Sequence, residues 1–94
     1  MKRKNNLKSQ VEFKKNAEDD LKKVFGRNLK ALRDQRDWSQ EVTASIAGVN
    51  RSYYAQMESG QRNPSLVNIS KLLAAFQVDF NDLLSIDEIK KLLK

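Results

Sequence analysis

Two short helical patterns separated by a single glycine constrain the fold of this chain more than any other feature. Ser39 is placed to cap one helix and Asn50 a second, because both side chains can accept a backbone N–H of an opening turn. Gly48 stands between them, where a residue that readily takes a positive φ can end a helix. Gly60 can close the second helix, which is expected to span residues 51–59. The sequence therefore predicts two short helices joined by a tight turn.

Such a pair of helices forms a helix-turn-helix, whose second helix can lie in the major groove of DNA. Val42, Ile46 and Ala47 fall on one side of the first helix at helical spacing and are expected to face the core.

A longer amphipathic helix is predicted before the pair, from about residue 17 to about residue 36. Its core face is a stripe of apolar residues at helical spacing: Leu21, Val24, Phe25, Leu29 and Leu32. Asn16, with Asp19 three residues later, has the pattern of an N-terminal cap. Trp38, in the connection that follows, is expected to anchor the core rather than to form a ligand platform.

Three more helices are predicted after the pair. Ser65 is placed to cap the first, Asp79 a short second one, and Ser85 with Glu88 forms a capping box for the last. The first of these has an apolar face at helical spacing: Leu66, Ile69, Leu72, Leu73 and Phe76. The chain is therefore expected to be an all-α, compact bundle of five to six helices. Its parts are a basic arm (1–16, disordered or partly helical), a helix-turn-helix domain (17–84) and a C-terminal helix (85–94).

Composition excludes several classes of function. The 94 residues include neither cysteine nor histidine, which removes disulfides, thiolate metal ligands, the usual zinc ligand and the usual general base. We therefore expect no catalytic residues, no metal and no cofactor. No apolar run approaches the length of a membrane span and no signal peptide is visible, so the expected location is the cytoplasm of a prokaryotic cell, with a phage-encoded origin also open.

The positive charge is concentrated at one end of the chain. The net charge is +6, and residues 1–15 carry six basic side chains and one acidic one, whereas residues 37–65 carry two basic and three acidic ones. A basic arm favours a polyanion such as DNA through attraction to its phosphates. A solubilising, disordered tail explains the same composition equally well.

The helix-turn-helix segment resembles the Cro and phage-repressor (XRE-type) helix-turn-helix family. The resemblance rests on these stretches: Ser39-Gln40-Glu41, Ala44 facing Gly48-Val49, Met57-Glu58-x-Gly60, and Arg62-Asn63-Pro64-Ser65. With Asn50-Arg51-Ser52-Tyr53-Tyr54, the chain is most similar to the controller proteins of restriction–modification systems. The resemblance covers roughly residues 21–84 and implies a lambda-repressor-like DNA-binding domain. It also implies a transcriptional regulator that binds double-stranded DNA.

The exposed side of the second helix carries the expected base contacts: Arg51, Ser52, Tyr53, Ala55 and Gln56. Arginine pairs with guanine O6 and N7, glutamine can pair with adenine N6 and N7, and alanine or tyrosine can pack on a thymine methyl. The family's usual base-contacting positions match Arg51, Ser52 and Gln56. For any one of these side chains, a phosphate contact or a solvated position is the alternative.

Phosphate contacts are expected on both sides of this helix. Ser39 and the backbone amides that open the first helix can bind an anion. The resemblance implies that Gln40 lies beside the first turn of the second helix, binds a phosphate and braces the neighbouring base-reading side chain. It also implies that Arg62 and Asn63 approach the DNA backbone from the following loop. Lys30 and Arg27 are weaker candidates for the same role.

The resemblance further implies an ion pair between Arg33 and Glu58 that joins the long helix to the end of the recognition helix. Two residues depart from the family pattern. Thr43 replaces the usual leucine, which predicts slight underpacking of the helix-two core. Tyr54 stands where an aliphatic side chain normally points inward, so its hydroxyl must find a partner or reach solvent.

A homodimer that binds a palindromic operator is expected, since one recognition helix reads few base pairs. The candidate two-fold interface is the apolar C-terminal surface: Phe80, Leu83, Leu84, Ile86, Ile89, Leu92 and Leu93. The alternative is that the last helix folds back on its own core. RNA polymerase is a further candidate partner, because a regulator bound beside a promoter can touch it.

A different class of function is also open: an antitoxin-type or other protein-interaction module on the same fold, with the terminal arm ordered by a protein partner. A toxin gene next door or a small acidic co-purifying protein would favour it. Sequence leaves undecided the operator, repression versus activation, any effector, and the choice among restriction–modification, phage and toxin–antitoxin systems.

Overall fold

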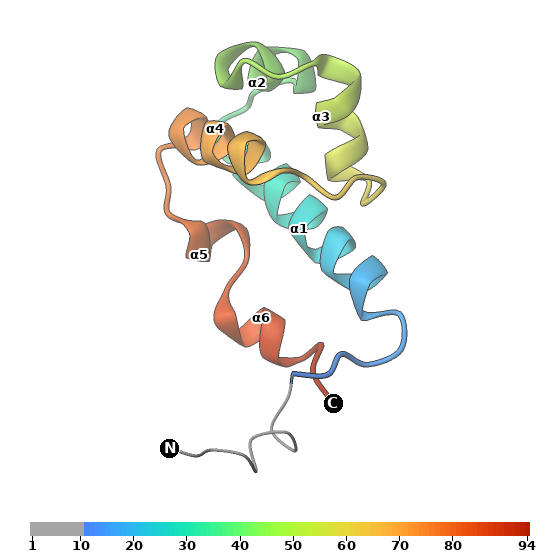
Figure 1. Ribbon diagram of the computed structural model, residues 1–94. Coiled ribbons are helices and arrows are strands. Elements are labelled where there is room, and N and C mark those ends of the chain that lie inside the picture. The colour runs from blue at the N-terminus through green and yellow to red at the C-terminus, as the bar shows by residue number, and fades with distance from the viewer. Residues whose placement is uncertain (1–10) are drawn as a thin grey trace.

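The computed structural model describes residues 11–94, which form six helices (Figure 1). These are α1 (Ala17–Asp34), α2 (Gln40–Ala47), α3 (Arg51–Glu58), α4 (Leu66–Phe76), α5 (Phe80–Leu83) and α6 (Ile86–Lys90). The expected all-α fold is confirmed. Helices α2, α3 and α4 gather around one part of α1, and α5 and α6 return along α1 toward its N-terminal end (Figure 1).

Side-chain caps set most of the helix starts. The Ser39 hydroxyl accepts from the Val42 N–H, and the Ser65 hydroxyl caps α4 in the same way. Ser85 and Glu88 form the expected capping box at α6. The predicted cap at Asn16 is wrong. Asn16 takes a left-handed conformation with φ of 67°, and its side chain makes no cap hydrogen bond, so only its backbone carbonyl starts the helix.

One core joins the first five helices, α1 to α5. Its largest fully buried side chains come from all of them: Tyr54, Phe76, Leu29, Met57, Leu72, Leu83 and Thr43. Trp38 anchors the edge of this core, because its ring stacks on Phe76 with the ring centres 5.8 Å apart.

The predicted core faces of α2 and α4 need correction. Val42 and Ile46 are 44% and 51% exposed, and Leu66 is 76% exposed. Ala47 is buried as expected, and the side of α2 that packs inward consists of small residues: Thr43, Ala44 and Ala47. Small side chains let α2 approach α3 and α4 closely, which turns the larger apolar residues outward. The Thr43 hydroxyl is fully buried and donates to the Ser39 carbonyl at 2.9 Å, so it has a partner.

The two ends of the described chain lie side by side. Phe13 and Leu93 form an antiparallel bridge, with Lys14 N–H donating to the Leu92 carbonyl at 2.8 Å and Lys94 N–H to that of Glu12 at 2.9 Å. Residues 12–14 therefore pair with the C-terminal segment, and residues 11–16 are not helical, in contrast to a partly helical arm. The expectations for residues 1–10 lie outside the described residues.

Asn28 ties the C-terminal part of the chain to α1. Its side-chain amide donates to the Leu83 carbonyl at 2.7 Å and to the Glu88 carboxylate at 3.1 Å. The last helix is thus attached to the body of its own chain. Among residues 11–94, no helix is both long enough and apolar enough to cross a membrane.

Candidate nucleic-acid interface

Helix α3 is held at the surface with one side buried and the other open. Tyr54 and Met57 on its inner side are fully buried, whereas Arg51 and Ser52 in its first turn are exposed. The Asn50 side chain caps this turn by accepting from the Tyr53 N–H at 3.0 Å. The start of α3 therefore presents its polar side chains to solvent.

The turn between α2 and α3 depends on Gly48. Its φ is 72°, in the left-handed region that other residues adopt only at a cost. The following residue, Val49, donates its N–H to the Ala44 carbonyl at 3.0 Å, which satisfies the end of α2. This conformation sets the angle at which α3 leaves α2.

The backbones of α1 and α3 meet at Gly26. A Cβ atom at this position would lie 2.5 Å from the Met57 carbonyl oxygen and closer still to that of Glu58. Real Cβ atoms do not approach other atoms so closely. Glycine is therefore required where α1 supports the C-terminal end of α3.

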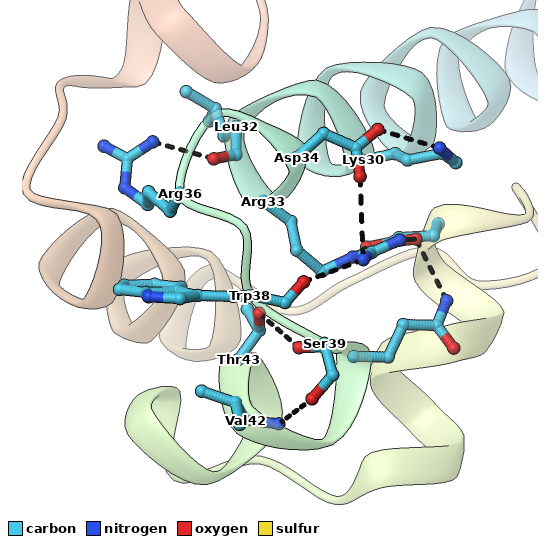
Figure 2. Close-up of polar contacts among 11 residues, drawn as sticks. Lys30, Leu32, Arg33, Asp34, Arg36, Trp38, Ser39, Val42 and Thr43 are labelled. Carbon is cyan, nitrogen blue, oxygen red and sulfur yellow. Dashed lines mark hydrogen bonds and ion pairs between the residues drawn. The ribbon is translucent and has the colours of Figure 1, made fainter.

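A buried ion pair fixes the same end of α3. Arg33 Nε donates to Glu58 Oε2 at 2.6 Å and Arg33 Nη2 to Glu58 Oε1 at 3.0 Å. The two side chains are 13% and 5% exposed. The same guanidinium donates from Nη1 to the Trp38 carbonyl at 2.9 Å, so it also holds the α1–α2 connection (Figure 2). Arg33 and Glu58 thus lie together as the resemblance implied.

Gln40 completes this cluster. Its side-chain amide donates to Glu58 Oε1 at 3.0 Å, at the last turn of α3. The expectation placed Gln40 beside the first turn of α3, whereas its side-chain amide contacts the last turn. Its contact to a phosphate and its bracing of a base-reading side chain stay predictions. Burial raises the pKa of Glu58, but hydrogen bonds from Arg33 and Gln40 outweigh it, and the pKa lies below its usual value.

Tyr54 buries its hydroxyl group instead of extending it to solvent. The hydroxyl oxygen lies near Glu58 and Arg33, but no group of the described residues meets both the distance and the angle of a hydrogen bond to it. Burial raises the pKa of this phenol well above its ordinary value. An unpaired buried hydroxyl costs stability, because water satisfied it in the unfolded chain.

We expect Tyr54→Phe to leave the domain as stable as the wild type or more stable by up to about 1 kcal/mol, because only an unpaired hydroxyl is removed. Urea denaturation measures this directly, with Tyr53→Phe as the control at a half-buried neighbour. A loss of more than about 1 kcal/mol in Tyr54→Phe would show that the hydroxyl does have a partner.

Two of the predicted contact groups meet each other. Arg62, expected to meet a phosphate, donates from Nε to Oε1 of Gln56, expected to read a base, at 2.6 Å. The Arg62 guanidinium also lies over the Tyr53 ring, 5.5 Å from its centre. Tyr53 itself is half-buried and packs against the core, so only part of its ring is open.

The other candidate contacts lie apart. Ala55 is half-buried on α3, Ser39 is exposed at the start of α2, and Asn63 is exposed in the loop before α4. Lys30 forms an exposed ion pair with Asp34 at 2.8 Å. Because Asp34 engages its ammonium group, Lys30 is less available to a phosphate.

Comparison with known proteins decides the family. A helix-turn-helix family model (HTH_3) matches residues 29–83. The control protein C.MunI from a Mycoplasma species is 41% identical over 68 residues, covering 71% of this chain and 92% of that protein. The control protein C.BamHI from Bacillus amyloliquefaciens is 33% identical over 72 residues, covering 76% and 89%.

A solved structure supports the same conclusion. The restriction–modification controller protein C.AhdI from Aeromonas hydrophila superposes with a TM-score of 0.65 at 43% identity, covering 67% of this chain and 96% of that one. The chain belongs to the XRE-type helix-turn-helix family. The expected resemblance, the all-α helix-turn-helix fold and a DNA-binding role in transcription regulation are confirmed. The three relatives are named as control or controller proteins rather than as enzymes.

In this XRE-type protein the C-terminal candidate residues divide into two groups. Leu83 is fully buried, and Leu84 and Leu92 are 9% and 8% exposed, so these three belong to the core of their own chain. Their assignment to an intersubunit interface is corrected on that ground. Phe80 and Ile86 remain open, at 43% and 58% exposure. Ile89 and Leu93 are half-buried.

Three residues that organise the site were not found from the sequence. Gly26 could have been noticed, because glycine is unfavourable inside a helix without a packing reason. Asn28 gave no such signal. Arg36 donates to the Phe76 carbonyl at 2.7 Å and lies over the Trp38 and Phe76 rings, so it closes the end of α4 against α1. Only the three-dimensional arrangement shows these partners.

Proposed function

We propose that this protein binds a palindromic DNA operator as a homodimer, with α3 in the major groove of each half-site. The supporting observation is the position of α3. Its inner side is fully buried at Tyr54 and Met57, while Arg51 and Ser52 are exposed at its first turn. A helix presented in this way fits the width of the major groove, and an arginine there can pair with guanine O6 and N7.

The contacts to the DNA backbone come from the elements beside α3 in this proposal. Ser39 and the first amides of α2 meet one phosphate, because a helix start carries free N–H groups and partial positive charge. The Gln40 amide nitrogen donates one of its two N–H groups to Glu58, so the second remains available to a phosphate. Asn63 approaches the backbone from the loop after α3.

The homodimer forms through the open part of the C-terminal surface. Phe80 and Ile86 supply its exposed apolar area, with Ile89 and Leu93 at the edge. A two-fold interface places two copies of α3 about one turn of DNA apart, roughly 34 Å. Sedimentation analysis at micromolar concentration should show a dimer, and a monomer alone would remove this part of the proposal.

Control of a restriction–modification operon is the biological role that fits best. It rests on the similarity to C.MunI, C.BamHI and C.AhdI, whose names describe control or controller proteins. Bound beside a promoter, the dimer would repress by covering promoter elements or activate by touching RNA polymerase.

Selection of bound fragments from a random DNA pool tests the proposal. The wild type should recover an inverted repeat, and Arg51→Ala should recover the same repeat with one relaxed base in each half-site, because a bidentate arginine contributes about 1–3 kcal/mol of discrimination. Arg27→Ala is the matched control: Arg27 is exposed on α1 and is a candidate for a phosphate contact rather than a base contact, so every base preference should remain. Recovery of no common sequence by the wild type would contradict the proposal.

A further inference from the structure

Gln56 and Arg62 lie against each other on the exposed side of α3. Gln56 follows Tyr53 by three residues, so both side chains leave the helix on the same face. Arg62, from the loop after α3, folds back over both of them. Its Nε donates to Gln56 Oε1 at 2.6 Å, and its guanidinium carbon lies 5.5 Å from the centre of the Tyr53 ring.

The backbone of the loop brings Arg62 to this position. Gln61 N–H donates to the Gln56 carbonyl at 2.9 Å, and Gly60, with φ of 79°, donates to that of Met57 at 3.2 Å. The chain therefore turns back on the last turn of α3 immediately before Arg62. The contact between Arg62 and Gln56 follows from the shape of this loop as well as from the two side chains.

This contact changes what Gln56 can do at a base. Reading adenine needs both the oxygen and the nitrogen of the glutamine amide, one as acceptor and one as donor. Arginine has only donors, so the amide oxygen of Gln56 must face Arg62. The amide oxygen has two lone pairs and Arg62 engages one of them, so Gln56 can approach a base only in the orientation that Arg62 sets.

The same contact orients Arg62. A guanidinium has five N–H groups; one is bound by Gln56, and the four on the two terminal nitrogens remain available to a planar acceptor. The Tyr53 ring supports the guanidinium from one side. An arginine already held in this way loses less conformational freedom when it binds a ligand.

We propose that Gln56 is a positioning residue for Arg62, and that Arg62, held by Gln56 and Tyr53, presents its terminal nitrogens to a bidentate acceptor on the DNA. This inference rests on the proposed function. The acceptor is a pair of oxygens or an oxygen and a nitrogen in one plane, which a phosphate and the edge of a guanine both offer. The contact lies at the surface and contributes little to folding, so variants of either residue should remain folded.

A double-mutant cycle tests the pairing on the operator recovered by selection. Gln56→Ala should weaken binding roughly three- to tenfold in the wild-type background, because the ordering of Arg62 is lost. In the Arg62→Ala background the same change should have less than about a twofold effect. Gln61→Ala is the matched control, because this neighbouring glutamine is exposed, and it should bind as the wild type does. Equal losses from Gln56→Ala in both backgrounds would overturn the proposal.

The recovered sequences identify the acceptor and exclude independent reading by Gln56. If Arg62 meets a phosphate, Arg62→Ala should keep the base preferences and reduce the salt dependence of binding by a slope of about 0.9. If it meets a guanine, Arg62→Ala and Gln56→Ala should relax the same base in each half-site. A base that relaxes in Gln56→Ala but not in Arg62→Ala would contradict the positioning role.

NMR spectra of the free protein separate this inference from the proposed function. The Arg62 δ protons should be shifted upfield by the Tyr53 ring, and the Arg62 Nε–H should exchange slowly; Gln56→Ala should reduce both effects. Absence of both signatures in the wild type would overturn the inference while leaving the operator proposal standing. Both signatures in a protein that binds no specific sequence would overturn the proposed function, and with it the role of this pair on DNA.

Discussion

Replacing Gly26 with alanine should destabilise the domain by about 3 kcal/mol, at the upper end of the usual cost of overpacking. The new methyl group would overlap the Met57 and Glu58 carbonyl groups, which are backbone atoms and cannot move without shifting α3. Alanine is otherwise the better helix former by roughly 1 kcal/mol, so the expected sign is opposite to the intrinsic preference. Urea denaturation of the two proteins measures the difference.

Gly48→Ala is the matched control for this change. Gly48 has a φ of 72°, but no atom lies within 4 Å of the position that a methyl group would take. Gly48→Ala should therefore destabilise the domain only by the cost of a left-handed conformation, about 1–2 kcal/mol. A Gly26→Ala variant as stable as the wild type would show that α1 and α3 do not cross as closely as described. The variant should also bind operator DNA more weakly, because α3 is displaced.

Replacing Arg33 with alanine should destabilise the domain by about 3–5 kcal/mol, because the Glu58 carboxylate is left buried without its partner. The change also removes the donor to the Trp38 carbonyl. The loss should appear as a large decrease in the urea midpoint with little change in the slope of the transition.

Lys30→Met provides the control on the same helix, since its ion pair with Asp34 is exposed and should contribute little. Replacing both Arg33 and Glu58 with leucine should recover a large part of the stability, because no unpaired charge remains. If Arg33→Ala and Lys30→Met have equal effects, the buried pair does not hold α3 in place.

The ion pair also makes stability depend on pH. The folded-state pKa of Glu58 lies below its ordinary value of 4.5, so the folded state binds a proton at this carboxylate less readily than the unfolded chain does. The stabilisation is present above pH 4.5 and is lost as the pH falls through the folded-state pKa. Glu58→Gln should weaken this acid dependence, measured by urea denaturation above and below that pH. If Glu58→Gln loses stability in acid as the wild type does, other carboxylates cause the pH dependence.

Much of the fold could be predicted because local signals coincide with the final structure. Ser39, Asn50 and Ser65 each cap the helix that they were expected to cap. The failures occur where packing between helices overrides periodicity. Val42 and Ile46 have helical spacing, yet they are exposed and the small residues of α2 face α3 and α4 instead.

At the candidate site, too, local signals were predictive and contacts that depend on the tertiary fold were not. Residue type and family pattern led to Arg33 and Glu58, which form a direct pair. They also led to Arg51, which is exposed at the start of α3 and whose base contact stays a prediction. The contact between Gln56 and Arg62 depends on a left-handed glycine that turns the loop back on α3, and no pattern in the sequence specifies that return. Asn28, whose partners lie more than fifty residues away in the sequence, is hidden for a similar reason.

Methylation protection of the selected operator tests most directly whether α3 lies in the major groove. Guanine N7 is exposed only in that groove, whereas adenine N3 lies in the minor groove. We expect the wild type to protect guanine N7 in two patches about 34 Å apart, one for each copy of α3, and to leave adenine N3 reactive there. Protection of adenine N3 with guanine N7 still reactive would contradict the account.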